Sequence, residues 1–207
     1  MEQFWLDAGN SKLYQNWWGG VIDGLFTKGG IYDSAPMKDF IKKEFPASTT
    51  MKRPVSVGIV DVLSGQYLPF TEANLTSGDN LINSLYASFA LPGFFAPVEA
   101  FGSKWFDGSA VYDIDIFSAV SRCIEKGYKQ SDVVIDVLLT SSAGLKQVDA
   151  HDYKSISMLF RFLEINSYYS SMDGILRAKF AYPTATFRYA IAPTKSLPTS
   201  WYPLVRL

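Results

Sequence analysis

Apolar residues recur at helical spacing in two stretches of the chain, residues 79–90 and 115–126. In the first stretch the apolar positions are Leu81, Ile82, Leu85, Tyr86 and Phe89. In the second stretch they are Ile116, Ala119, Val120, Cys123 and Ile124. Residues spaced in this way share one face of an α-helix, and a Pro-Gly pair or a single glycine follows each stretch, as at a helix end. The pattern predicts a helix over each stretch, with these residues buried.

Two other stretches have the pattern of β-strands. Residues 55–62 are rich in β-branched side chains and nearly alternate, and a Ser-Gly turn leads to an extended return over 67–70. Residues 133–139 are almost continuously apolar, which is typical of a strand buried on both faces of a parallel sheet. Because this strand follows a helix, and an earlier strand also precedes a helix, the order indicates an α/β fold.

The remaining elements follow from weaker patterns. Helices are predicted over residues 11–26 and 37–45, and over 153–180 with a break near 166–171, where polar residues gather. A short extended piece over 104–106 leads into an Asp-Gly pair, and alternation over 187–191 predicts a last strand. Prolines beyond this strand favour an irregular tail.

Composition and charge exclude several classes of protein. The chain has 207 residues, enough for one domain with a sizeable core. Its 19 basic and 20 acidic residues nearly cancel, which argues against a nucleic-acid-binding protein. No apolar run is long enough for a transmembrane helix. The N-terminus does not have the pattern of a secretory signal peptide, so the expected localisation is cytoplasmic.

The chain has one cysteine, Cys123, and one histidine, His151. A single cysteine cannot form an internal disulfide or a cysteine-built metal site, and no metal or organic cofactor is expected. A thiol hydrolase would need both residues. Cys123, however, falls on the apolar face of its predicted helix and is interpreted as a core residue, and His151 falls in a polar connection and is interpreted as a surface residue.

The most informative stretch ends in a carboxylate directly before a glycine, Asp107-Gly108. A predicted helix, a Pro-Gly turn, an apolar loop and a short strand precede it, so we expect Asp107 at the mouth of an apolar concavity lined by residues 87–98. Burial among apolar neighbours raises the pKa of a carboxyl group and makes it a better proton acceptor near neutral pH. The alternative interpretation is an ordinary Asp-Gly turn. Asp113 or Asp115 is predicted to cap the following helix.

Four segments resemble, in order, parts of the patatin-like phospholipase family. They are YQNWWGGVIDGLFTKGGIYDSAP at 14–36, VSVGIVDVLSGQYLPF at 55–70, ASFALPGFFAPV at 87–98 and FDGS at 106–109. The resemblance covers about residues 14–140. It implies a three-layer α/β/α fold with a mostly parallel sheet, and a lipid acyl hydrolase that uses a Ser-Asp dyad without histidine.

The resemblance also implies roles for three residues. Asp107 corresponds to the proton acceptor of the dyad, Gly108 to the glycine of its motif, and Ser109 stands where the family has Gly or Ala. The implied partner is a lipid or acyl-ester substrate, with peripheral contact to a membrane. The whole chain, 1–207, is expected to be the C-terminal part of a single domain of this family, with its helices and tail at 141–207.

The chain departs from the family at the nucleophile. It contains no G-x-S-x-G motif and no glycine-rich oxyanion loop before it. We therefore expect that the N-terminal strands are missing and that the chain by itself is inactive, as in a truncated gene model, a partial transcript or a degenerate paralogue. One alternative is a non-catalytic lipid- or protein-binding remnant of the same fold. Another is an unrelated α/β binding domain.

Overall fold

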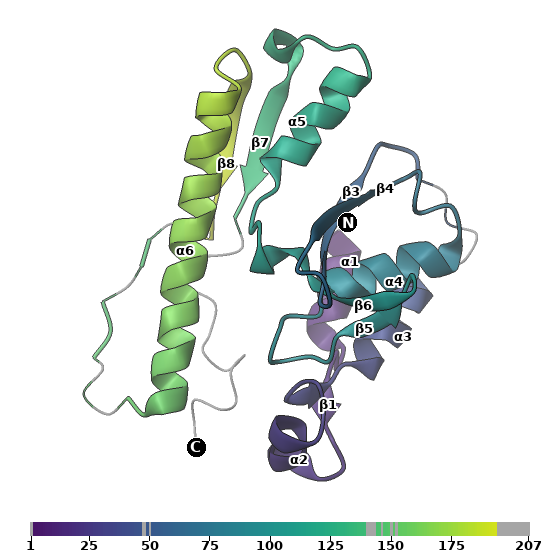
Figure 1. The fold of residues 1–207 in the computed structure, drawn as a ribbon, viewed down its shortest axis with the longest axis vertical. Helices are drawn as coiled ribbons and strands as arrows, with labels where there is room; N and C mark the ends of the chain where they lie inside the picture. The colour runs from purple at the N-terminus through teal and green to yellow at the C-terminus, as the bar shows by residue number, and fades with distance from the viewer. Residues whose placement is uncertain are drawn as a thin grey trace. The chain divides into compact units, whose positions relative to one another are not determined.

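In the computed structural model the chain forms two compact units, Met1–Tyr112 and Asp113–Leu207 (Figure 1). The structure describes residues 2–46, 49, 51–139, 144–145, 147–149, 151 and 153–193. The irregular tail expected at the C-terminus lies outside these residues from 194 onward. Helices and strands occur in both units, which confirms the prediction of a mixed α/β fold.

The centre of the first unit is a four-stranded antiparallel sheet in the order β4-β3-β6-β5. Its strands are β3 (Ser56–Asp61), β4 (Tyr67–Thr71), β5 (Val98–Ala100) and β6 (Ser103–Asp107). Tight turns join β3 to β4 and β5 to β6, and such short connections can only join antiparallel neighbours. The expectation of a mostly parallel sheet is therefore wrong for these strands.

Helix α4 (Gly78–Ser88) packs against β3, β5 and β6, and α3 (Ala35–Glu44) packs against α4. The prediction of a helix at 79–90 is confirmed. It begins at Ser77, whose hydroxyl accepts a hydrogen bond from the backbone N–H of Asn80 at 3.2 Å. Much of the core of this unit lies between α4 and the sheet, and its buried residues include Ile59, Leu81, Ala87, Val98 and Trp105.

The N-terminal segment forms four short elements, α1 (Glu2–Asn10), β1 (Gln15–Asn16), α2 (Gly20–Phe26) and β2 (Tyr32–Asp33). Two of them, β1 and α2, lie within residues 11–26, where one helix is predicted. β1 pairs with β2 in antiparallel fashion, so residues 15–16 are extended instead of helical. Gly20 then adopts a φ of 71°, a left-handed conformation that glycine reaches without strain, and α2 starts there. The prediction of a single helix is therefore wrong.

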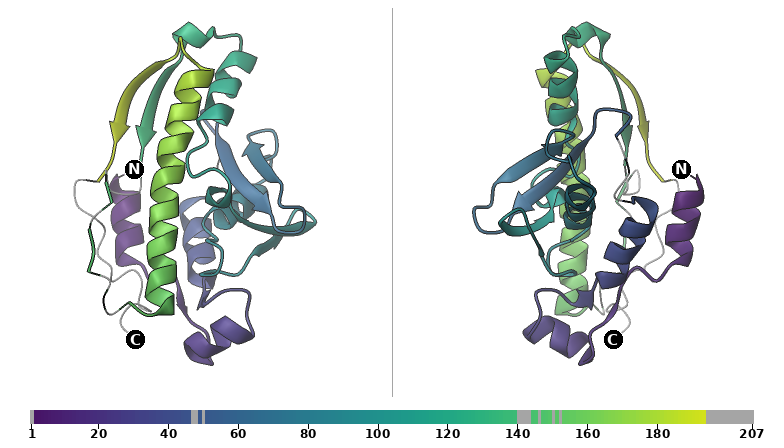
Figure 2. Two further views of the ribbon diagram at one scale, coloured as in Figure 1. Left: turned by 60° about the vertical axis from the view of Figure 1, so that its left-hand side comes forward. Right: turned by 90° about the vertical axis from the view of Figure 1, so that its right-hand side faces the viewer.

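In the second unit, β7 (Val134–Leu138) and β8 (Thr186–Ile191) form a parallel pair. The helices α5 (Ile116–Glu125) and α6 (Ser155–Ala181) pack on one face of this pair (Figure 2). The short 3-10 helix η2 (Gln130–Asp132) precedes β7. The predicted strand at 133–139 is confirmed, but it is buried on one face only. Val137 is 4% exposed, whereas Val134 and Leu138, on the opposite face, are 52% and 71% exposed.

The second unit's helices differ from prediction in one respect each. In α5, Ile116 and Val120 are buried as expected, but Ala119 and Ile124 are exposed. α6 runs without a break through residues 166–171, where two helices are predicted. Serine side chains in this part of α6 bind a partner outside the helix, as described below, so they do not interrupt it.

Candidate active site at the end of strand β6

Asp107 is the last residue of β6. In the sheet it lies opposite Ile59 of β3, and its backbone N–H donates to the carbonyl of Ala90 at 3.1 Å. The 3-10 helix η1 (Gly108–Ala110) follows at once, and the Asp107 carboxylate accepts a hydrogen bond from the Ser109 N–H at 2.9 Å. The half-buried carboxylate thus caps the turn that follows the strand. A carboxylate accepts several hydrogen bonds, so this contact is compatible with a second role.

Gly108 is buried because the chain passes directly over another strand. A Cβ atom at this position would lie 2.6 Å from the carbonyl carbon of Gly58 in β3 and 3.0 Å from the ring of Tyr67. Tyr67 in turn packs edge-on against Tyr112, with ring centroids 4.9 Å apart. Only glycine fits between these groups, which explains the Asp-Gly sequence in terms of packing. The Ser109 contact uses the backbone, so serine in place of Gly or Ala leaves the turn intact.

The segment at 14–36 packs against the apolar loop that follows α4. The N–H of Tyr32 donates to the carbonyl of Phe94 at 2.9 Å. A Cβ on Gly30 would lie 2.3 Å from the carbonyl carbon of Phe95, so the two backbones are in direct contact. The indole N–H of Trp17 closes the arrangement by donating to the Gly30 carbonyl at 2.9 Å. These two segments therefore form one continuous piece of structure beside β6.

A buried pair of hydroxyls joins the same segment to α4. Ser34 is buried, and its Oγ lies 2.8 Å from the phenolic oxygen of Tyr86, within hydrogen-bonding distance. Burial raises the pKa of the Tyr86 hydroxyl, so it stays protonated at neutral pH. The ammonium group of Lys38 lies 5.5 Å from the centre of the Tyr86 ring. Sequence analysis did not find this pair, because no local pattern links residues so far apart.

β3 ends in an Asp-x-x-x-Gly sequence, residues 61–65, which forms a turn around the Asp61 carboxylate. This carboxylate accepts hydrogen bonds from the Leu63 N–H at 2.9 Å, the Ser64 hydroxyl at 3.0 Å and the Ser103 hydroxyl at 2.6 Å. These contacts, above all that of Ser103, lower the pKa of Asp61. Gly65 completes the turn with a φ of 72°. The aspartate therefore ties the β3–β4 turn to the start of β6.

The three acidic residues near the end of the matched segments have separate structural contacts. Asp107 caps η1 in the first unit. In the second unit, Asp115 caps α5 by accepting from the Ser118 N–H at 2.9 Å, which settles the choice between Asp113 and Asp115 as the cap. Among the described residues, no group of three or more His, Cys, Asp or Glu side chains is placed to hold a metal ion.

Asp113 takes part in a serine–aspartate contact between side chains of the second unit. The Ser171 hydroxyl, in the middle of α6, donates to the Asp113 carboxylate, and the Ser167 hydroxyl lies 3.3 Å from the same oxygen. Ser171 is 1% exposed, so an acyl carbonyl cannot reach its oxygen. This pair fastens the segment before α5 to α6 and is a structural contact.

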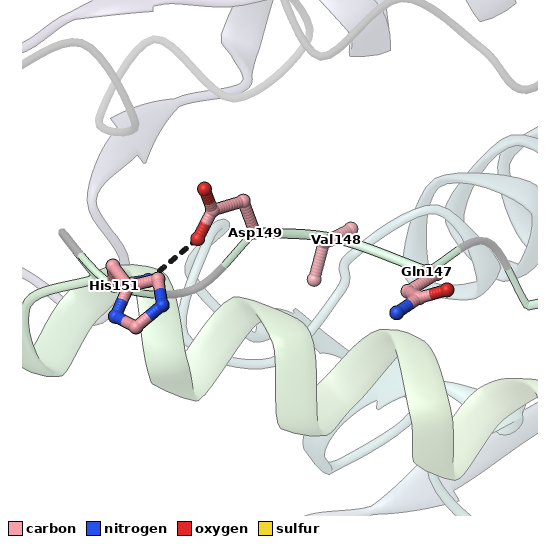
Figure 3. A pocket seen from close by; sticks show the side chains of 4 residues that line it. All are labelled: Gln147, Val148, Asp149 and His151. Carbon is pink, nitrogen blue, oxygen red and sulfur yellow. Dashed lines mark hydrogen bonds between the residues drawn. The ribbon is translucent and has the colours of Figure 1, made fainter.

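Cys123 and His151 follow their predicted roles. Cys123 is half-buried on α5 and packs against the core of the second unit. His151 is exposed in a surface pocket lined by Gln147, Val148, Asp149 and His151 (Figure 3). Its contact there comes from its backbone N–H, which donates to the Asp149 carboxylate at 3.1 Å. The imidazole is therefore a surface group.

A second pocket is lined by Lys179, Tyr182, Pro183, Ala185 and Phe187. Both pockets are formed by residues of the second unit, so the apolar concavity expected beside Asp107 stays a prediction. The helices of the described part of the chain are also too short or too polar for any of them to cross a membrane.

Together these observations define a mixed α/β protein with an Asp-Gly turn at a strand end, which backbone contacts connect with the segments at 55–70, 87–98 and, through the last of these, 14–36. A family model for patatin-like phospholipase matches residues 1–120. The chain therefore belongs to the patatin-like phospholipase family. A comparison with curated proteins found no match.

The match covers the whole of the first unit and the first residues of α5. All four segments that carry the resemblance in the sequence fall within it. Contacts between backbones connect them, from Tyr32 to Phe94, from Asp107 to Ala90, and from Asp107 to Ile59 across the sheet. The motifs of the family thus form one compact region of the molecule.

Proposed function

We propose that this protein is a lipid acyl hydrolase of the Ser-Asp dyad type, in which Asp107 is the proton acceptor and Gly108 and Ser109 complete its motif. The observation that carries the proposal is the position of Asp107: a half-buried carboxylate at a strand end, held by the Ser109 N–H and in backbone contact with the family's segments at 55–70 and 87–98. Its substrate class is a lipid or another acyl ester.

The chemistry is nucleophilic acyl transfer. A serine hydroxyl attacks the acyl carbonyl while Asp107 takes its proton, and the alcohol leaves with a proton as the acyl-enzyme forms. Water then attacks the acyl-enzyme, again giving up its proton to the carboxylate, and the fatty acid is released. The dyad needs the two oxygens within about 2.6–3.2 Å of each other. Histidine takes no part, which is consistent with an exposed His151.

The attacking serine is not among these 207 residues, because they contain no G-x-S-x-G motif. Ser171, which contacts Asp113, is too buried to replace it. We therefore propose that this chain alone is inactive. The three-layer arrangement belongs to the same proposal, and further strands would have to complete it.

Two measurements test the proposal. The 207-residue chain should hydrolyse short p-nitrophenyl esters no faster than background, since water activated by Asp107 alone is a poor substitute for a dyad. The transcript should then be read upstream of the Met1 codon for an in-frame G-x-S-x-G. In the protein that contains it, Asp107→Asn should lower kcat at least about 100-fold.

Asp115→Asn is the matched control, because asparagine also caps a helix and activity should be retained. Robust hydrolysis by the 207-residue chain that Asp107→Asn abolishes would mean that another serine is the nucleophile. Full activity of Asp107→Asn in the longer protein would show that Asp107 is not the proton acceptor.

The missing motif also favours a second candidate function, a non-catalytic lipid- or protein-binding protein with the same fold. The sequence of the transcript upstream of the Met1 codon distinguishes the two candidate functions. An upstream reading frame without a nucleophile motif would support the binding protein and contradict the hydrolase.

A further inference from the structure

Helix α2 (Gly20–Phe26) is attached to the protein through a glycine. Its buried residue is Gly24, and a Cβ atom there would lie 2.2 Å from the carbonyl oxygen of Ile31. The helix backbone therefore lies directly on the chain that leads into β2. A typical surface helix turns its apolar side chains toward the core, whereas α2 leaves no space for side chains between Gly24 and its neighbour.

The large apolar side chains of this segment face away from the protein. Trp18 and Phe26 are 105% and 81% exposed, Ile22 is 73% exposed, and Leu25 is also exposed. Ile22 and Phe26 are spaced four residues apart, so they lie along the same side of the helix, and Trp18 lies in the turn that leads into it. We call these four residues the α2 face. Its exposure follows directly from packing the helix through Gly24.

The segment that carries the α2 face has little net charge. Between residues 17 and 28 the ionisable side chains are Asp23 and Lys28, which balance. Asp23 is half-buried and accepts a hydrogen bond from the Thr27 hydroxyl, and the Lys28 ammonium lies 5.4 Å from the centre of the Trp17 ring. Within the first unit, α2 lies beyond β1, away from the four-stranded sheet (Figures 1 and 2). The α2 face is thus a neutral apolar surface at one end of this unit.

The size and chemistry of the α2 face favour a lipid surface as its partner. Its four side chains expose on the order of 600 Å², whereas each partner in a stable protein interface contributes about 800 Å². Tryptophan is enriched where proteins meet the headgroup region of a bilayer, and a short helix with an aromatic and aliphatic outer side can lie in that region. The family match adds a lipid-related enzyme class to these observations.

We propose that the α2 face inserts into the surface of a phospholipid membrane. The inference rests on the proposed function, which makes lipids the substrates, and names the surface by which the protein reaches them. Because the face is neutral, insertion depends on apolar contact more than on attraction to anionic lipids. Binding should therefore be similar on zwitterionic and anionic membranes and change little with salt.

Flotation with vesicles tests the proposal on the whole 207-residue chain. One set of vesicles contains phosphatidylcholine alone and the other adds phosphatidylserine. The parent chain should float with both sets, and raising the salt from 0.1 to 0.5 M should change its partition less than about twofold. The double variant Trp18→Ser/Phe26→Ser should lose at least about tenfold in partition, because both side chains leave water on insertion.

Leu63→Ser is the matched control, since Leu63 is a comparably exposed apolar residue on the β3–β4 turn of the same unit, and it should float like the parent. The melting temperatures of all variants should agree. If the double variant has a lower melting temperature than the parent, the single variants Trp18→Ser and Phe26→Ser are measured instead. Each should lose several-fold in its partition to vesicles.

Three outcomes overturn the proposal: a parent chain that stays unbound, a double variant that floats like the parent, or binding only to the anionic vesicles. A fall in molar mass of the double variant by light scattering, with flotation unchanged, would assign the α2 face to contact between copies. Flotation measures adsorption of the protein to vesicles and does not require turnover. The membrane proposal can therefore be confirmed or contradicted even if the hydrolase proposal fails.

Discussion

Gly108 and Gly58 lie so close that a Cβ atom on Gly108 would be 2.6 Å from the Gly58 carbonyl carbon. One glycine follows the proposed catalytic aspartate, and the other lies in the middle of β3, one of the two inner strands of the sheet. Their contact fixes how near the turn after β6 comes to β3, and so fixes the position of Asp107. The glycine of the Asp-Gly sequence is therefore required by packing, whatever the chemistry of the carboxylate before it.

Gly108→Ala should destabilise the first unit by about 2 kcal/mol or more, since the added methyl group meets backbone that cannot move aside. Gly9→Ala is the control, because no atom lies within 4 Å of a Cβ at Gly9 in α1, and it should be neutral or slightly stabilising. Urea denaturation followed by tryptophan fluorescence reports on this unit, which contains Trp5, Trp17, Trp18 and Trp105. Equal stability of the two variants would refute the packing argument.

The stability of the first unit should depend on the ionisation of Asp61. Its pKa is lowered in the folded protein, chiefly by the Ser103 hydroxyl. A lowered pKa contributes stability that is present above the unfolded value of about 4 and is lost as the pH falls through the folded value. Asp61→Asn should therefore be less stable than the parent at pH 7, and the difference should shrink at acidic pH. Denaturation at several pH values measures it, and a constant difference would contradict the assignment.

The buried hydroxyl of Ser171 should contribute to the stability of the second unit. Ser171→Ala should cost about 1–2 kcal/mol, because it removes a hydrogen bond to the Asp113 carboxylate. Ser167→Ala should cost less, since its contact with the same carboxylate is 3.3 Å long and the residue is only half-buried. Thermal unfolding by circular dichroism compares the two. A larger effect at Ser167 would show that the contact at Ser171 is not the one that fastens α6.

Two valines in β7 test whether that strand is buried on one face. Val137→Ala should destabilise the second unit by about 2 kcal/mol, because its side chain is packed between the strand and the helices. Val134→Ala, on the exposed face, should change stability by less than about 0.5 kcal/mol. Thermal unfolding followed by circular dichroism measures the stability of both variants. Equal losses would show that the outer face is covered by another part of the protein in solution.

Local sequence signals predicted the elements whose partners are close by. The helices at α4 and α5 follow from apolar spacing, and residue type limits the cap of α5 to Asp113 or Asp115, of which Asp115 is the cap in the structure. The short strand before Asp107 also lies where the order of motifs places it. Asp107 ends this strand, and its carboxylate caps the turn that follows.

Structural features that depend on residues far apart in the sequence could not be predicted from local patterns. Strand direction in the sheet depends on which strands meet, and the alternation in residues 55–62 is the same for parallel and antiparallel neighbours. The serines of α6 indicate a helix break when considered alone, but Asp113 binds two of them. A single helix is predicted over residues 11–26, whereas residues 15–16 pair with a distant strand and α2 is packed through Gly24 with its apolar side chains exposed.

The central position of β3 in its sheet has a consequence for the order of folding. Its neighbour β4 follows it directly in sequence, whereas its other neighbour, β6, comes only after α4 and the apolar loop. A hairpin between adjacent strands closes in microseconds, but pairing across a long intervening segment has to overcome a larger loss of chain entropy. We therefore expect the β3–β4 hairpin to form first and β6 to join it late. Asp107, at the end of β6, reaches its final position only with that last step.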